Sequence, residues 1–320
     1  MSRIRRIAPG LGRGGLLGNT EGPESYLREL DTLPSQFCRA TGGTETVISQ
    51  GGKFYRVHTF TDVGTSSLTF TRGGFVEYLI VGGGGGGGSR SGVSGGGGAG
   101  GLIFKNSLLS PSNYSIFVGA GGQRQYGNTF PYDGGPGEDS TAFGDTALGG
   151  GAFYDYDTNS GLDGSGGSGA GGGRHAEKQT GGARLQPTSS SGGFGNSGGD
   201  YGGSAGNAGG GGGAGAAGSS TGAGGIGKYY GDKFGDSPGD SGYFAGGGGG
   251  APTITGGLGG GGDGTSGCSN AQDGAPNTGG GGGAQGNTTT CITGFSGAGG
   301  SGIVIARYRI TQAEYEAEAA

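Results

Sequence analysis

The residue types that most often carry out catalysis are sparse in this chain. Its two histidines, His58 and His175, lie far apart in the sequence. Serine and aspartate are plentiful, but nothing in their spacing marks a nucleophile with its base. The sequence therefore predicts that the protein is not an enzyme and has no catalytic residues.

Motifs for phosphate, metal and disulfide chemistry are also uninformative. Gly-x-Gly-x-x-Gly recurs by chance among 96 glycines, and no Gly-Lys-Ser/Thr loop occurs. Calcium-binding repeats need a Gly-Asp pattern in series, whereas the Gly-Asp pairs here are isolated. We expect no metal and no cofactor. Cys38, Cys268 and Cys291 form no disulfide framework, and we favour free thiols, with a Cys268–Cys291 pair across a glycine loop as the alternative.

The sharper chemical signal is aromatic. Tyr and Phe recur between glycine tracts, among Gly, Asn, Asp and Ser, and this mixture is typical of antibody paratopes. Either these rings contact a sugar or a protein on a partner's surface, or they pack at the ends of the glycine segments and between subunits. The candidates for contact with a receptor or partner are Tyr126, Phe130, Tyr132, Tyr154, Tyr156, Tyr229, Tyr230, Phe234, Tyr243 and Phe244.

A second candidate contact region lies in the first 50 residues. Four arginines precede the first acidic residue, Glu21, and residues 24–31 offer an apolar pair at helical spacing. This arm either docks on an acidic face of a partner or is a solvated leader, and we favour docking. Contact of the arm alone with nucleic acid is the weaker alternative. The candidates for attachment are Arg3, Arg5, Arg6, Arg13, Leu27 and Leu30.

Composition excludes several classes of protein. The chain has 320 residues and a formal net charge of −5, so it lacks the basic surface that wholesale or specific nucleic-acid binding requires. It has no apolar run long enough to span a membrane, and its basic N-terminus lacks the apolar stretch of a secretory signal. Glycine does not recur at every third position with abundant proline, so the chain is not collagen.

The apolar pattern predicts a mainly β fold. Residues 54–60 alternate, with Phe54, Arg56, His58 and Phe60 on one face, and short strands follow at roughly ten-residue spacing. This spacing favours a β-sandwich or jelly-roll-like core. We divide the chain into an arm (1–50), a glycine-rich β domain (51–310) and an acidic tail (311–320). Within the domain, core strands fall in 54–148 and 303–308, and glycine tracts fill 149–302.

The glycine tracts are expected to be ordered rather than flexible. They are short and similar in length, and turn-rich loops with aromatic residues separate them. Glycine loses much backbone entropy on ordering, so order requires dense packing and satisfied backbone groups. Extended segments with three residues per turn and no internal hydrogen bonds can bond sideways to their neighbours. We therefore predict a bundle of polyglycine-II-like helices.

Three stretches resemble one known family. The strand and tract of 76–88 (VEYLIVGGGGGGG), the stretch 114–122 (YSIFVGAGG) and the stretch 300–308 (GSGIVIARY) look like the glycine-rich domain of tailed-phage tail fibres and related virion proteins. The resemblance covers about residues 54–308. It implies a virion protein, made in the host cytoplasm, that attaches by its N-terminus to other virion proteins. By the same analogy it implies a trimer that presents its loops to a cell-surface glycan or protein.

Two further functions stay open on the sequence. The chain could be a head fibre, decoration or tail-assembly protein whose loops contact other virion subunits. It could also be a non-viral glycine-rich structural or ice-binding protein, although ice binding requires a flatter and more regular face than these loops offer.

Overall fold

The structure is a computed structural model that describes residues 37–91, 93–126, 134–154, 164–174, 179–186, 192–203, 206–287 and 293–319. Contacts group Phe37 and everything after it into one compact unit. All six attachment candidates of the arm fall outside the described residues. Within the described ranges, no helix has the length and apolar character needed to cross a membrane.

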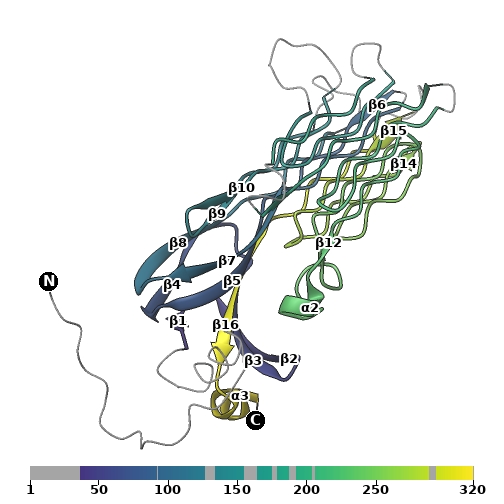
Figure 1. The fold of residues 1–320 in the computed structure, drawn as a ribbon. Coiled ribbons are helices and arrows are strands. Elements are labelled where there is room, and N and C mark those ends of the chain that lie inside the picture. Colours follow the sequence, from purple (N-terminus) through teal and green to yellow (C-terminus); the bar gives the residue numbers. More distant parts are fainter. Residues whose placement is uncertain are drawn as a thin grey trace, which may run out of the picture. The chain divides into compact units, whose positions relative to one another are not determined.

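Two antiparallel sheets form the base of this unit (Figure 1). The first has the strand order β1-β4-β8-β9-β10, and the second has the order β11-β7-β5-β16-β3-β2. The predicted mainly β fold with two packed sheets is confirmed. The strands of the first sheet are β1 (Arg39–Thr41), β4 (Gly64–Arg72), β8 (Ser112–Val118), β9 (Ser140–Ala142) and β10 (Asp145–Ala147). Those of the second are β2 (Thr44–Gln50), β3 (Lys53–Phe60), β5 (Gly74–Val81), β7 (Leu102–Leu109), β11 (Gly193–Phe194) and β16 (Ile303–Ile310).

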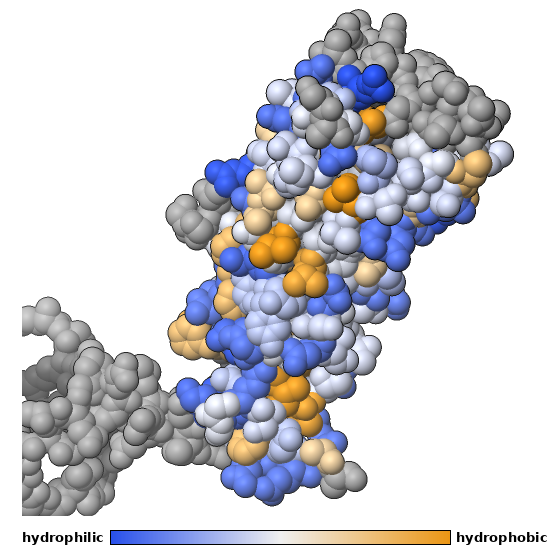
Figure 2. All heavy atoms as spheres, turned by 90° about the vertical axis from the view of Figure 1, so that its right-hand side faces the viewer, coloured by the Kyte–Doolittle hydropathy of each residue, from blue (hydrophilic) through white to orange (hydrophobic). Residues whose placement is uncertain are grey.

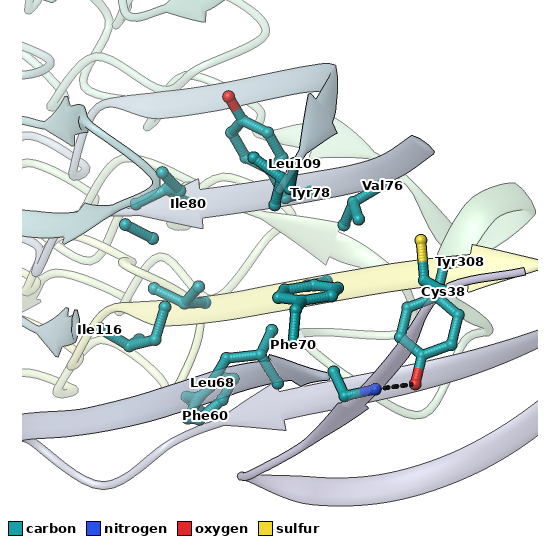
Figure 3. Close-up of a cluster of buried hydrophobic side chains, with 14 of the residues drawn as sticks. Cys38, Phe60, Leu68, Phe70, Val76, Tyr78, Ile80, Leu109, Ile116 and Tyr308 are labelled. Atoms are coloured by element: carbon teal, nitrogen blue, oxygen red, sulfur yellow. Dashed lines mark hydrogen bonds between the residues drawn. The ribbon is translucent and has the colours of Figure 1, made fainter. Parts of the chain in front are cut away.

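The main hydrophobic core lies between the two sheets (Figure 3). Leu68 and Phe70 of β4 face Val76 and Ile80 of β5, and all four are almost fully buried. Because strand side chains alternate, the same strands turn their other residues to the opposite face of the sheet. On β3 the inner face carries His58 and its alternating neighbours, as the sequence predicts.

The base begins earlier and ends later than the sequence suggests. We assigned residues 37–50 to the arm, but they contribute β1 and β2 to the two sheets. The tail residues form the helix α3 (Gln312–Ala319), whose Tyr315 ring lies 4.8 Å from the ring of Phe54. A capping box opens this helix, because Thr311 Oγ1 accepts from the Glu314 amide while Glu314 accepts from the Thr311 amide.

The glycine segments run side by side beyond one end of the sheets, and β5 and β16 continue directly into them (Figure 1). We call this bundle the lattice. In the tract Gly82–Gly88, every third amide donates to the same neighbour. The amides of residues 82, 85 and 88 donate to the carbonyls of residues 101, 98 and 95 of one segment. Those of residues 83 and 86 donate to residues 138 and 135 of a second segment, and those of residues 84 and 87 donate to residues 300 and 297 of a third. A three-residue period over three neighbours is the pattern expected of polyglycine-II-like helices.

Each central tract is surrounded on all sides. The carbonyls of Gly82–Gly88 accept hydrogen bonds from the amides of three further segments, around Gly122, 150–153 and 282–285. Together with the three segments that accept from its amides, the tract has six bonded neighbours. The returning segment 95–101 also bonds to six neighbours, of which Gly82–Gly88 is one. The backbone groups inside the lattice are therefore satisfied by neighbouring tracts instead of water.

Close approach explains why the tracts are glycine. A Cβ on Gly83 would lie 1.9 Å from the carbonyl oxygen of Ala120, and one on Gly84 would lie 2.0 Å from that of Gly280. Neither residue has a φ in the left-handed region. Glycine is required here because neighbouring backbones occupy the space of a side chain, and not because of the local conformation.

The lattice carries a few short elements of its own. Among them, β6, β15 and β14 form a small parallel sheet, and β12 pairs with β13. Their bounds are β6 (Ser89–Ser91), β12 (Lys228–Tyr229), α2 (Gly231–Phe234), β13 (Tyr243–Phe244), β14 (Thr265–Ser266) and β15 (Gln285–Asn287).

Candidate functional site

The lattice has two ends, and they differ in what they carry. The sheet end is where Val81 gives way to Gly82, beside the strands, and the outer end is where the tract finishes at Gly88. Because Gly87 donates to the Gly297 carbonyl, Phe295 lies at the outer end. Gln125 lies there too, since its carbonyl accepts from the Ser296 amide at 3.0 Å.

Four side chains gather at the outer end, and we call them the outer-end cluster: Arg124, Tyr126, Asp273 and Phe295. The guanidinium carbon of Arg124 lies 4.7 Å from the ring centroid of Phe295. The Tyr126 ring lies 5.7 Å from the same ring, measured between centroids, and 63% of Tyr126 is exposed. Arg124 also forms an ion pair with Asp273 at 2.5 Å. The cluster therefore combines two rings, a cation and an anion at the surface.

This arrangement is suited to binding and not to covalent chemistry. The cation over the Phe295 ring holds Arg124 in place, and the Asp273 carboxylate fixes its direction. An exposed ring beside such a pair offers an apolar face together with donors and acceptors, which suits a sugar ring or a polar peptide. Nothing in the cluster places a nucleophile next to a base. Tyr154, also at the outer end, is half-buried.

Five of the candidate rings lie instead at the sheet end, on the excursion from Lys228 to Phe244. Tyr230, Phe234 and Phe244 are buried there with the outer face of the six-stranded sheet. The Phe104 ring of β7 lies 4.8 Å from Tyr230 and 6.2 Å from Phe234, measured between centroids. Burial raises the pKa of the Tyr230 phenol. We named Tyr230, Phe234 and Phe244 as candidates for contact with a receptor or partner. In the structure they are buried in the core and are not accessible at the surface.

The other two rings of this excursion are accessible. The rings of Tyr229 and Tyr243 lie with their centroids 5.0 Å apart and are tilted by 49°, and Tyr229 donates a hydrogen bond of 2.8 Å to Asp236. This hydrogen bond raises the pKa of the Tyr229 phenol. Figure 2 views the side of the molecule on which α2 lies, where apolar residues form separate small patches on a largely polar surface. Tyr229 is exposed and Tyr243 is half-buried, so the pair is a surface feature of the sheet end and lies apart from the outer-end cluster.

The sequence analysis missed three members of the outer-end cluster. Arg124 and Phe295 each sit in a glycine-rich stretch, and Asp273 lies in a turn-rich segment far from both. The available signal was the rarity of large side chains inside the tracts, which makes Arg124 and Phe295 conspicuous. Their proximity depends on which tracts are neighbours, and sequence spacing does not give that.

Several predictions fall outside the described residues or need correction. Phe130, Tyr132 and Tyr156 lie outside the described ranges, as does Cys291. We favoured free thiols, but Cys268 is disulfide-bonded, and Cys38 is a free buried thiol. Among the residues that the structure describes, no group of His, Cys, Asp and Glu side chains is arranged to hold a metal ion.

The family model for a glycine-rich domain matches residues 60–309. This chain belongs to that glycine-rich domain family. The match runs from the last residue of β3 into β16, so the glycine-rich domain includes most of the two sheets as well as the lattice. No curated protein is similar enough to the chain to count as a match.

Proposed function

We propose that this glycine-rich domain protein is a non-catalytic structural component of a tailed-phage particle, a tail fibre or adhesin that attaches by its N-terminal arm. The outer end of its lattice contacts a glycan or protein on the host surface. The observation that carries the proposal is the lattice itself, whose central tracts are each bonded to six neighbours. Such a body can hold surface residues at a fixed distance from the sheets, and it needs no enclosed active site.

Two further observations support this proposal. The described unit begins with β1, which pairs with the end of β4 that points away from the lattice and so lies opposite to the outer-end cluster. The outer end carries an exposed ring beside an ion pair, which suits recognition through many weak contacts. Several copies on one particle would strengthen such contacts through multivalency. The resemblance to phage fibre domains supplies the class of particle.

The experiment compares two matched variants, in each of which one exposed tyrosine is replaced by alanine. Labelled full-length protein is tested for binding to a panel of whole bacterial cells and to immobilised bacterial glycans. Tyr126→Ala should abolish binding, whereas Tyr229→Ala, an exposed ring at the sheet end, should leave it unchanged. Binding that survives loss of Tyr126 and Phe295 but requires Tyr229 would contradict the proposal. Binding to purified virion subunits through the outer end, with none to cells, would support a decoration or assembly role instead.

A further inference from the structure

The two sheets of the base have four edges, and they are not equally protected. Three edge strands are very short: β1 and β10 have three residues each, and β11 has two. The fourth, β2, has seven residues. Long exposed edges are templates for pairing with another chain, and short edge strands are a common way to prevent it. In the described part of the chain, β2 is therefore the longest of the four edge strands.

The turn after β2 determines which of its backbone groups point outward. Gly51 and Gly52 have φ of +56° and +72°, as in the two-residue type I′ turn of a hairpin. In such a hairpin the flanking pair, Gln50 and Lys53, is hydrogen-bonded, and bonded pairs then alternate along the strand. The amides and carbonyls of Glu45, Val47 and Ser49 therefore face away from β3. Within the described ranges, no strand pairs with them.

The strand is held firmly while its edge stays open. Val47 packs against the core between the sheets, and Ile48 packs against the cluster on the outer face. Gln50 donates a hydrogen bond of 3.1 Å from its side chain to the Gly231 carbonyl. The strand contains no Lys and no Pro, and its one charged residue, Glu45, lies 3.6 Å from Arg56. The strand itself therefore carries neither of the two residue types that most often block edge pairing, while its neighbours α2 and α3 pack against it.

We propose that β2 pairs antiparallel with β2 of a second copy of this chain, around a two-fold axis at Val47. In this register Val47 lies opposite Val47 of the second copy. Thr46 lies opposite Ile48 of the second copy, and Glu45 lies opposite its Ser49. All the outward groups then find partners, in about six backbone hydrogen bonds. The register places β-branched residues opposite each other and brings no like charges together, both of which favour the pair.

The proposal has two structural consequences. The six-stranded sheets of the two copies become one continuous sheet, and the two lattices point in opposite directions because paired strands are antiparallel. The inference does not rest on the proposed function. It differs from the trimer that the family resemblance implies, because a two-fold edge pair closes on itself.

The test is sedimentation equilibrium of the full chain over a range of micromolar concentrations. Wild type should show a monomer–dimer equilibrium. Ser49→Pro removes an outward amide without touching the bonds to β3, so it should raise the dimer Kd at least about tenfold. Ser49→Ala keeps the amide and should leave the Kd unchanged. Circular dichroism checks that each variant is folded.

Two charge variants test the register itself, and they remain informative if the proline variant misfolds. Ser49→Lys places a cation opposite Glu45 of the second copy and should lower the Kd about two- to tenfold, since two such pairs form. Ser49→Glu should raise the Kd by a similar factor. A monomer at all concentrations, a trimer, or equal shifts for the two charge variants would overturn the proposal.

Discussion

His58 Nε2 lies 3.2 Å from the hydroxyl oxygen of Tyr308, and both residues are buried between the sheets. The Ala40 amide donates to the same hydroxyl at 3.0 Å (Figure 3). Because the Gly42 carbonyl can only accept, Nδ1–H donates to it at 2.8 Å, and in a neutral imidazole Nε2 then accepts from the Tyr308 hydroxyl. This network suits a neutral imidazole, which burial favours by lowering the pKa of His58. It also ties β1 to β3 and β16, at the point where the chain enters the base.

The neutral His58 predicts a pH-dependent stability. Burial lowers its pKa below the ordinary value, and this outweighs the opposing effects of the Gly42 carbonyl and Glu45. The unfolded state therefore binds a proton that the folded state does not, once the pH falls below about 6.5. We expect the free energy of unfolding to fall between pH 7 and 5.5, by at most about 1.4 kcal/mol per pH unit from this residue. Urea denaturation at several pH values measures it.

The control for this prediction is His58→Gln, which keeps hydrogen-bonding groups but does not titrate. The variant is expected to be less stable at pH 7 and to lose the decline between pH 7 and 5.5. An identical decline in wild type and variant would show that other groups cause it.

Cys38 is expected to be unreactive in the folded protein. Burial raises the pKa of its thiol to about 11, and the Sγ lies 3.6 Å from the Phe75 carbonyl. Because the thiolate is the reactive form, alkylation at pH 8 should be slow and should accelerate with added urea in parallel with unfolding. The free-thiol signal measured with a chromogenic disulfide reagent tests this. Rapid labelling of folded protein at Cys38 would show that this end of the base opens easily.

Gly84→Ala is expected to destabilise the lattice strongly. The added methyl would lie 2.0 Å from the Gly280 carbonyl oxygen, so two tracts must separate, at a cost of about 2 kcal/mol or more. Gly203→Ala is the matched control, because its φ of +65° strains an alanine but no atom lies within 4 Å. The control should cost only about 1 kcal/mol. Equal costs, measured by thermal or urea unfolding, would argue against tight packing of the tracts.

Phe234→Ala separates a structural ring from a contact ring. Phe234 is buried beside Phe104, and its ring centroid lies 5.6 Å from the guanidinium carbon of Arg307. Removing such a ring typically costs about 3–5 kcal/mol. Tyr126→Ala, at the exposed outer end, should cost less than about 1 kcal/mol. A Phe234 variant that is as stable as the Tyr126 variant would contradict the assignment of this ring to the core.

Much of the fold can be read from the sequence because strands and tracts leave local signals. Alternation predicts the inner face of β3, and the predicted closing strand at 303–308 falls within β16. The strand β2 was missed because its alternation is weak and polar. Each tract runs from one end of the lattice to the other, so the end at which a loop lies depends on how many tracts precede it. The excursion with Tyr230 and Phe234 therefore looked like an exposed loop, and the contact between Arg124 and Phe295 was not predictable.

The most direct test of the account is hydrogen exchange, followed residue by residue, in the full-length protein. The amides of Gly82–Gly88 and of 96–101 each donate to a neighbouring segment, with the donors of Gly82–Gly88 at 2.8–3.1 Å. We expect these amides to exchange as slowly as those of β5 and β16. Fast exchange throughout both tracts, with slow exchange only in the sheets, would contradict an ordered lattice.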